Sequence, residues 1–310
     1  MRIVFFGTGK FGIPSLERLI QSNHEVIAVI SQPDRKKGRG MKIQPTPVKE
    51  FVWTMRPEIE VIQPEKASEK GFIAHLATMK ADLFVAIDYG QILSGELLEV
   101  PARYCVNLHP SLLPRYRGPA PVAWAILNGE RTTGNTVIRM NERMDAGDIL
   151  LQKKMPLKGT ETRGELLKRL SYEGAELVLK AVELIDSDAE NLVEQNEKAA
   201  TYAPKLSREV ARIDWKDSAE DIERKVRAMQ PRPGAFARID RKTLKIIEAG
   251  VVETARTKGK PGTVETTNGF IVNTGKGKLY VKKLQLEGKR PMTSEEFLRG
   301  FRVEGGTALK

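Results

Sequence analysis

YCVNLHPSLLP, at residues 104–114, ends an apolar strand with a cluster of polar side chains. Apolar and polar positions alternate as far as His109, so Asn107 and His109 project from the same face of the strand. Pro110 and Pro114 prevent a regular continuation. In open α/β sheets the carboxyl ends of strands are where ligands bind. We therefore predict a functional site at this strand end.

Outward from this strand, the first half of the chain alternates short apolar runs with helical patterns. Pro14, for example, begins a pattern that places Leu16 and Leu19 on one helix face. Such alternation predicts a Rossmann-like α/β domain in which a mostly parallel sheet is joined by right-handed crossovers. The expected strands are residues 3–6, 26–31, 83–87, 104–108, 135–140 and 149–155, and the expected helices include 121–127 and 164–185.

The C-terminal part has a different pattern, in which short strand-like runs are separated by glycine-containing turns. This pattern predicts a small β-barrel of the oligonucleotide-binding (OB-like) kind, a fold that often binds RNA. The expected strands are residues 235–239, 244–247, 262–265, 270–272 and 279–284. We expect an α/β domain at residues 1–187, a polar linker at 188–206, and the barrel at 207–310.

Positive charge is concentrated in the expected barrel. Residues 224–290 contain 17 lysines and arginines but 5 aspartates and glutamates, a net charge of +12, whereas the whole chain carries +11. This segregation favours contact between the barrel and a polyanion.

Other bulk features exclude several classes of protein. The single cysteine, Cys105, excludes an intramolecular disulfide and a cysteine-based zinc site, and we expect no metal. The chain has no signal-like start and no apolar stretch long enough to span a membrane. We expect a cytoplasmic monomer.

A glycine motif provides the main rival interpretation. Residues 7–12, GTGKFG, satisfy the G-x-G-x-x-G pattern of dinucleotide-binding proteins, and Asp34 follows at about the distance of a ribose-binding acid. A tight strand-to-helix turn explains the same glycines. Because Asp34 opens a basic stretch and the polar cluster lies on another strand, we favour the turn and expect no nicotinamide cofactor.

An amide, an imidazole and a carboxylate are the groups that acyl transfer to an amine requires. Asn107 can donate to a developing oxyanion, and His109 can move a proton near neutral pH. A carboxylate between two expected strands can tune the imidazole, although spacing alone does not choose between Asp145 and Asp148. Ser111 as a nucleophile is disfavoured, because no G-x-S-x-G motif surrounds it.

A basic stretch at residues 35–42 suggests a second contact with nucleic acid. Five of its eight residues are basic, and two glycines and nearby prolines indicate an exposed loop. Its expected phosphate contacts are Arg35, Lys36, Lys37, Arg39 and Lys42.

With these features assembled, the sequence resembles the methionyl-tRNA formyltransferases, a family of folate-dependent enzymes. The matching segments are residues 32–49, 107–118, 144–148, 202–206 and 212–215. The central motif is shared with formyltransferases that act on glycinamide ribonucleotide and on amino sugars, whereas the basic stretch and the C-terminal segments narrow the resemblance to the tRNA enzymes.

The resemblance implies a donor, an acceptor and a set of residues. The donor is 10-formyltetrahydrofolate, and the acceptor is the α-amine of initiator methionyl-tRNA, which attacks the formyl carbon directly. Asn107, His109 and Asp145 fall at the catalytic positions, and Arg39 lies in the loop expected to approach the tRNA acceptor stem. The implied folate contacts are Ser111, Leu112, Leu113, Pro114, Tyr89 and Gly90.

Three positions depart from the family pattern. Gly9 replaces a common proline, Asp88 replaces a small apolar residue beside the expected folate pocket, and Pro119 replaces an alanine. Two alternative functions stay open: a formyltransferase for a sugar nucleotide or other small amine, and an RNA-binding protein with an inactive enzyme-like domain.

Overall fold

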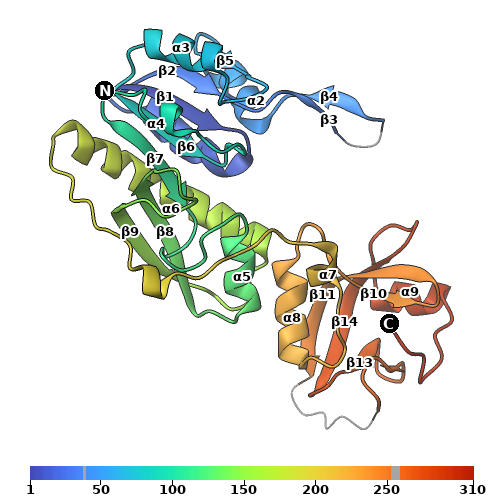
Figure 1. The fold of residues 1–310 in the computed structure, drawn as a ribbon. Helices are drawn as coiled ribbons and strands as arrows, with labels where there is room; N and C mark the ends of the chain where they lie inside the picture. Colours follow the sequence, from blue (N-terminus) through green and yellow to red (C-terminus); the bar gives the residue numbers. More distant parts are fainter. Residues whose placement is uncertain (38–39, 253–258) are drawn as a thin grey trace. The chain divides into compact units, whose positions relative to one another are not determined.

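The chain divides into two compact units (Figure 1). The computed structural model describes residues 1–37, 40–252 and 259–310. The first unit contains residues 1–121, 132–156 and 167–203. The second contains residues 122–131, 157–166 and 204–310. Most of the segment that the sequence analysis assigned to a linker, up to residue 203, thus lies with the first unit.

Seven strands of the described chain form the sheet of the first unit, in the order β5-β2-β1-β6-β7-β8-β9. The strands from β5 to β7 run parallel, β8 is antiparallel to β7, and β9 is antiparallel to β8. The predicted mostly parallel α/β sheet is confirmed. The strands are β1 (Arg2–Gly7), β2 (Glu25–Ile30), β5 (Glu60–Ile62), β6 (Leu83–Ile87), β7 (Tyr104–His109), β8 (Thr132–Arg139) and β9 (Ile149–Pro156).

The long helix α6 (Arg163–Asp186) confirms the expected helix at 164–185. Its backbone is held to the sheet by Asn135, whose buried Nδ2 donates to the Leu170 carbonyl over 2.8 Å. Gly174 permits the close packing, because a Cβ there would lie 2.5 Å from Leu108 Cδ2. The other helices in the first half of the chain are η1 (Lys10–Gly12), α1 (Ile13–Ile20), α2 (Pro47–Met55), α3 (Lys70–Thr78), α4 (Gly95–Leu98) and α5 (Pro121–Leu127).

Aromatic packing joins the central strands of this sheet. The rings of Phe6 on β1 and Phe84 on β6 are fully buried, with centroids 5.1 Å apart. Tyr89, just after β6, packs edge-on against Phe6 at 5.4 Å. Burial of apolar surface stabilises the folded state by roughly 25 cal/mol per Å². Because these side chains are large and buried, their packing holds the ends of β1 and β6 next to each other.

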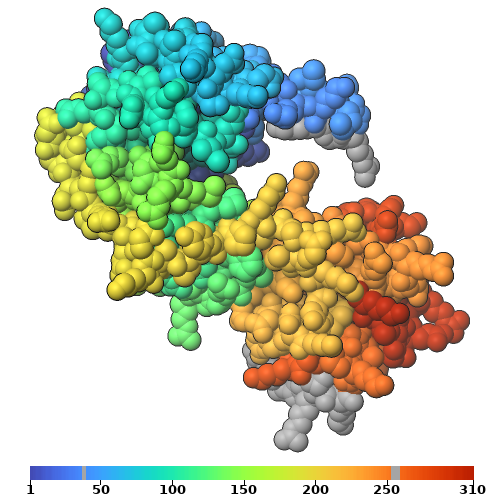
Figure 2. Space-filling view, in the orientation of Figure 1, coloured from blue at the N-terminus to red at the C-terminus, as the bar shows by residue number. Residues whose placement is uncertain are grey.

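A short hairpin is found where the sequence analysis expected an exposed basic loop. β3 (Arg35–Lys37) pairs antiparallel with β4 (Lys42–Gln44). The hairpin projects from the body of the first unit (Figures 1 and 2). Lysine-rich strands carry no apolar alternation, which explains why the sequence did not reveal them.

The second unit contains an antiparallel sheet of order β10-β11-β14-β13-β12, with β15 beside β14. The last residues join its two edges. Lys310 exchanges two backbone hydrogen bonds with Arg238 of β10, and Ala308 pairs with Thr263 next to β12. The expected small barrel is therefore confirmed as an antiparallel sheet whose edges are bridged by the C-terminus. No helix in the described ranges has the length and apolar character needed to cross a membrane.

The bounds of the remaining elements follow the chain from the end of the first unit to the C-terminus. They are η2 (Glu197–Ala199), α7 (Arg208–Ala211), α8 (Ala219–Ala228), β10 (Ala235–Ile239), β11 (Lys242–Val252), β12 (Val264–Glu265), β13 (Ile271–Asn273), β14 (Lys278–Leu286), β15 (Met292–Thr293) and α9 (Ser294–Gly300).

Candidate functional site

The end of β7 carries the two polar side chains on which the sequence analysis centred. Asn107 pairs with Ile138, and His109 with Thr136, on the antiparallel strand β8. His109 is 5% exposed, whereas Asn107 is half-buried. Within the described residues the Asn107 amide has no hydrogen-bond partner, so its N–H groups are open to a ligand.

The two ring nitrogens of His109 have different partners. Nε2 lies 2.9 Å from the carbonyl oxygen of Tyr116. Because a carbonyl oxygen only accepts, Nε2 must carry a proton and donate. Nδ1 lies 3.5 Å from Asp145 Oδ1. Nδ1 is therefore the nitrogen that can exchange a proton with the carboxylate or with a substrate.

Asp145 lies in the loop between β8 and β9 and adopts a left-handed conformation, with φ of 51°. One carboxylate oxygen, Oδ1, faces His109, while Oδ2 accepts a hydrogen bond from the Gly118 amide over 2.7 Å. Asp148 instead pairs with Arg139 Nη2 at 2.8 Å. The structure thus places Asp145, and not Asp148, beside the imidazole.

The segment after β7 is clamped by the two antiparallel strands. Thr136 Oγ1 on β8 donates to the Ser111 carbonyl over 2.7 Å and accepts from the Leu113 amide. Gln152 Nε2 on β9 donates to the Leu113 carbonyl over 3.0 Å. Ser111 and Leu113 are buried, whereas Leu112 and Pro114 are half-buried. Leu112 and Pro114 are therefore the members of this expected folate segment whose side chains remain accessible.

Ser111 is not placed as a nucleophile. Its side chain is 1% exposed, and its hydroxyl donates to the Arg115 carbonyl over 2.6 Å. The nitrogens of His109 are directed at Tyr116 and Asp145 instead. A serine–histidine proton relay would require both arrangements to change.

A buried arginine next to this centre was missed by the sequence analysis. Arg117 is 2% exposed, and its guanidinium pairs with both carboxylate oxygens of Glu197 at 3.0 Å. Hydrogen bonding from Arg117 holds the pKa of the Glu197 carboxyl below its usual range. The same guanidinium donates to Gln195 Oε1. An arginine followed by a glycine, as at Arg117, is typical of a solvated residue, and so is a glutamine in a polar stretch, as at Gln195. The sequence therefore carried no signal for this contact.

The loops that follow β1 and β6 meet at the carboxyl ends of these two strands. The amide of Thr8 donates to the Asp88 carbonyl over 3.1 Å, and Thr8 Oγ1 donates to the Tyr89 carbonyl over 2.7 Å. Tyr89 is itself 4% exposed, and burial raises the pKa of its hydroxyl to about 12. Its side chain therefore belongs to the core. Gly90 is exposed, with φ of 93°.

Asp88 occupies the space that a side chain at residue 9 would need. A Cβ on Gly9 would lie 1.8 Å from Asp88 Oδ2. Asp88 as a residue is exposed, but desolvation of its carboxyl in the niche beside Gly9 raises its pKa to about 6. The two departures at Gly9 and Asp88 are therefore sterically complementary in this chain.

This niche predicts a pH-dependent stability effect. The pKa of Asp88 is raised from 3.8 to about 6, so the native state holds more protons than the unfolded state between these values. Unfolding free energy consequently falls as the pH rises through that window, and the full penalty applies above it. We expect Asp88→Asn to raise the urea midpoint at pH 8 but to give little gain near pH 4.

Gly9→Ala provides the control for the Asp88 prediction. The new methyl group displaces the Asp88 carboxylate toward water, so Asp88→Asn should lose its pH-dependent gain in the Gly9→Ala background. An equal gain from Asp88→Asn at pH 8 and near pH 4 in the otherwise native chain would contradict the assigned burial.

The arrangement also disfavours a dinucleotide at the glycine turn. The Asp88 carboxylate lies over Gly9, where it would repel a pyrophosphate. Asp34 is already bound by Lys49 Nζ and Gln63 Nε2, each at 2.7 Å. Burial acts to raise the pKa of Asp34, but these hydrogen bonds outweigh it and hold the pKa below its usual value. In the described chain no three His, Cys, Asp or Glu side chains cluster as metal ligands.

The expected nucleic-acid contacts lie on the projecting hairpin. The side chains of Arg35, Lys36 and Lys42 are exposed and make no ion pair with the described residues. Lys37 lies on β3. Arg39 lies outside the described residues.

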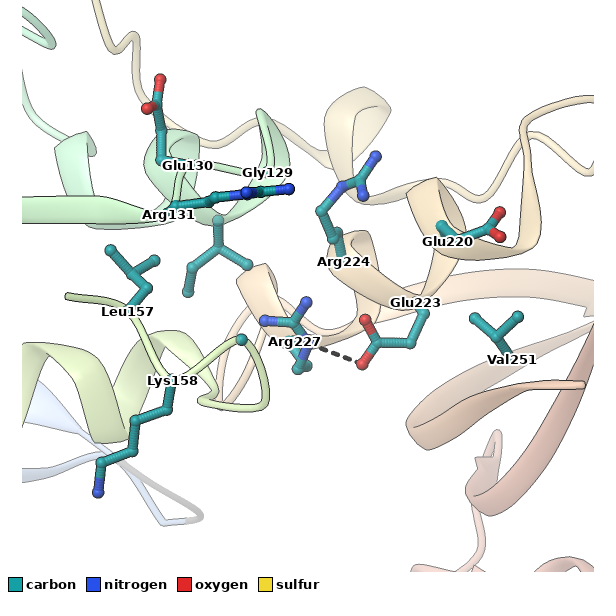
Figure 3. A pocket seen from close by; sticks show the side chains of 12 residues that line it. Gly129, Glu130, Arg131, Leu157, Lys158, Glu220, Glu223, Arg224, Arg227 and Val251 are labelled. Carbon is teal, nitrogen blue, oxygen red and sulfur yellow. Dashed lines mark hydrogen bonds and ion pairs between the residues drawn. The ribbon is translucent and has the colours of Figure 1, made fainter. Parts of the chain in front are cut away.

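A hollow lies within the second unit (Figure 3). It has a volume of about 310 Å³. Arg131 extends toward the helix that carries Arg224, whose guanidinium pairs with Asp221. Arg227 pairs with Glu223 at 2.6 Å. Among the described residues, its lining contains no histidine, asparagine or aspartate, the side chains that meet around the end of β7. The lining is Ile126, Gly129, Glu130, Arg131, Leu157, Lys158, Gly159, Glu220, Glu223, Arg224, Arg227 and Val251.

Family models match both parts of the chain. The one described as Formyl transferase matches residues 1–182, and the one described as Formyl transferase, C-terminal domain, matches residues 205–302. A protein from Desulforamulus reducens named methionyl-tRNA formyltransferase is 41% identical over 311 residues, covering 100% of this chain and 98% of the relative. A protein of the same name from Agathobacter rectalis is 40% identical, covering 99% of each.

Solved structures with lower identity share the fold. WlaRD, a sugar 3N-formyl transferase crystallised in the presence of dTDP and 5-N-formyl-THF, has a TM-score of 0.68 at 20% identity, covering 94% of this chain and 99% of that one. HypX from Aquifex aeolicus has a TM-score of 0.67 at 22% identity, covering 98% of this chain and 48% of that one.

Proposed function

The chain belongs to the methionyl-tRNA formyltransferase family, and we propose that Asn107, His109 and Asp145 form the centre at which it transfers a formyl group from 10-formyltetrahydrofolate to the α-amine of initiator methionyl-tRNA. The observation that carries the residue assignment is the 3.5 Å approach of His109 Nδ1 to Asp145 Oδ1. Asn107, two residues before His109 on β7, has an amide without a hydrogen-bond partner among the described residues. An amide donor, an imidazole and a carboxylate meet at one strand end.

The accessible residues around this centre fit a folate co-substrate. Leu112 and Pro114 offer half-buried apolar surface, and Gly90 leaves its backbone open. Among the described residues, a Cβ on Gly90 would approach just Gln32 Cγ, 3.8 Å away, so a planar ring system can approach this backbone closely. Tyr89 contributes through its backbone, because its ring is buried against Phe6.

Each of the three residues has a distinct task. The bound co-substrate supplies the formyl carbon: its bond to the acceptor amine forms, its bond to N10 breaks, the amine loses a proton and N10 gains one. Asn107 donates a hydrogen bond to the formyl oxygen as negative charge develops there. His109 acts through Nδ1, because Nε2 is committed to the Tyr116 carbonyl. Asp145 stabilises the protonated ring and accepts protons relayed from the amine.

Exposed basic groups support tRNA as the carrier of the amine. Arg35, Lys36 and Lys42 project on the hairpin without ion pairs to described residues, so they are available for phosphates. The second unit contributes Arg131, which is exposed at its hollow, whereas Arg224 there is half-buried and paired with Asp221 (Figure 3).

Affinity for tRNA should therefore depend on salt and on the hairpin. We expect the logarithm of the binding constant to fall linearly with the logarithm of salt concentration, because phosphate contacts release counterions. Arg35→Ala combined with Lys42→Ala should reduce the slope by about 2, at about 1 per lost contact. Filter binding across a salt series measures both slopes.

Lys70→Ala is the matched control, because Lys70 is an exposed lysine at the start of α3. It should leave the slope unchanged. A hairpin variant with the native slope would exclude these two residues from phosphate contact.

A formyl-transfer assay tests the proposed function directly. Purified protein is given 10-formyltetrahydrofolate with initiator methionyl-tRNA and, separately, with a panel of amino-sugar nucleotides. Transfer to the tRNA alone is expected. Transfer to a sugar amine would retain the chemistry but reject the acceptor, and binding of tRNA without transfer would favour an inactive RNA-binding protein.

A further inference from the structure

Gln195 connects Arg117 to the backbone around Asp145. Its side chain is 4% exposed. Nε2 donates to the carbonyl oxygens of Asp145 and Gly147, over 2.9 and 2.7 Å. Oε1 accepts from Arg117 Nε and Nη2, over 3.1 and 2.8 Å. Both amide protons and the amide oxygen are thus fully used.

The orientation of this amide is fixed by chemistry. A guanidinium can only donate, and a carbonyl oxygen can only accept. Rotating the Gln195 amide by half a turn would place its N–H groups against Arg117 and its oxygen against two carbonyl oxygens. Gln195 therefore has one stable arrangement, in which it tethers the Asp145 loop to Arg117.

Arg117 is in turn held rigidly. Its guanidinium pairs with both oxygens of Glu197. Its backbone amide donates to the Thr201 carbonyl over 2.8 Å, and its carbonyl accepts from the Ala203 amide over 2.7 Å. All of these partners lie in the polar segment at 188–206, so this segment fixes the anchor to which Gln195 is bound.

Asp145 needs such support because of its conformation. A left-handed φ of 51° is unfavourable for a non-glycine residue and persists where surrounding contacts hold it in place. Gln195 holds the Asp145 carbonyl, and the Gly118 amide holds the carboxylate. The carboxylate is thereby kept facing His109 Nδ1.

We infer that Gln195 is a positioning residue for formyl transfer, which acts by holding the Asp145 carboxylate against His109. This inference rests on the proposed function, since it assigns Gln195 a role through the proposed carboxylate. Gln195 reaches Asp145 through the backbone, and its side-chain hydrogen bonds go to Arg117, Asp145 and Gly147, not to His109 or Asn107. Its loss should therefore lower kcat with little change in substrate binding.

The test combines Gln195→Leu with Asp145→Ala in the full-length protein. Gln195→Leu alone should lower kcat by about tenfold to a hundredfold, because displacement of a catalytic group by about 1 Å has effects of this size. The KM values for folate and tRNA should change by less than about threefold. In the Asp145→Ala background, Gln195→Leu should lower the residual rate by less than about twofold, because residues that act as a unit are not additive.

The outcomes separate this inference from the function on which it rests. An equal loss of kcat in both backgrounds would reject positioning through Asp145 while leaving the catalytic assignment intact. Native turnover in Asp145→Ala alone would reject both. If Gln195→Leu does not fold, as judged by thermal unfolding, the isosteric Gln195→Glu replaces it, because its second oxygen faces the same two carbonyls.

Gln285→Glu is the matched control for Gln195→Glu. Gln285 lies on β14, where its Nε2 donates to the Lys289 carbonyl over 2.8 Å, far along the chain from the proposed site. It should retain native kcat. The Gln195→Glu variant should show the same loss of kcat, and the same dependence on Asp145, as Gln195→Leu. Native kcat in Gln195→Glu would overturn the inference.

Discussion

His109→Ala should lower kcat by about two to four orders of magnitude, the range that general acid–base groups contribute. The substitution removes the Nδ1 that faces Asp145 and leaves that carboxylate without a partner for the relayed proton. Rapid-quench measurement of formyl transfer in a single turnover reports the chemical step directly. The affinity for tRNA should change little, because His109 is buried and makes no contact with the exposed basic groups.

His75→Ala controls for loss of an imidazole as such, since His75 is exposed on α3. It should retain native activity. Asp145→Ala combined with His109→Ala should be no slower than His109→Ala by more than about threefold, because the two groups work as a unit. Fully additive losses would show that the carboxylate acts independently of the ring.

The strand end could be predicted from sequence because it depends on local rules. The alternation of side chains along a strand places Asn107 and His109 on one face. Pro110 ends the strand whatever the neighbouring strands are. The choice between Asp145 and Asp148 was beyond such rules. It depends on the left-handed turn at Asp145 and on the pairing of Asp148 with Arg139.

The features that could not be predicted from the sequence are contacts between segments that lie far apart along the chain. Gln195 and Arg117 are 78 residues apart, and nothing in either neighbourhood indicates that both are buried. Gly9 and Asp88 each stood out as departures, yet their steric complementarity follows from β1 and β6 being neighbours in the sheet. Periodicity predicted those strands without specifying which side chains meet beyond their ends.

Gly147→Ala should produce the second large effect, because the new methyl group collides with backbone. Its Cβ would lie 1.7 Å from the Arg139 carbonyl oxygen and 2.8 Å from the Arg139 carbonyl carbon. The loop cannot yield easily, since Asp148 O accepts from the Arg139 amide and Gly147 O accepts from Gln195. We expect the free energy of unfolding to fall by about 1–3 kcal/mol, the usual cost of overpacking.

The same collision should displace Asp145, two residues away, and lower kcat by about a hundredfold. Urea unfolding and single-turnover transfer measure the two effects. Gly9→Ala is the decisive comparison, because its Cβ overlap of 1.8 Å is with the tip of the Asp88 side chain, which can rotate away. Gly71→Ala, with nothing within 4 Å of its Cβ, should leave both quantities near native. If Gly147→Ala is no more harmful than Gly9→Ala, the Asp145 loop is not held by its backbone contacts, and the basis for placing the carboxylate against His109 fails.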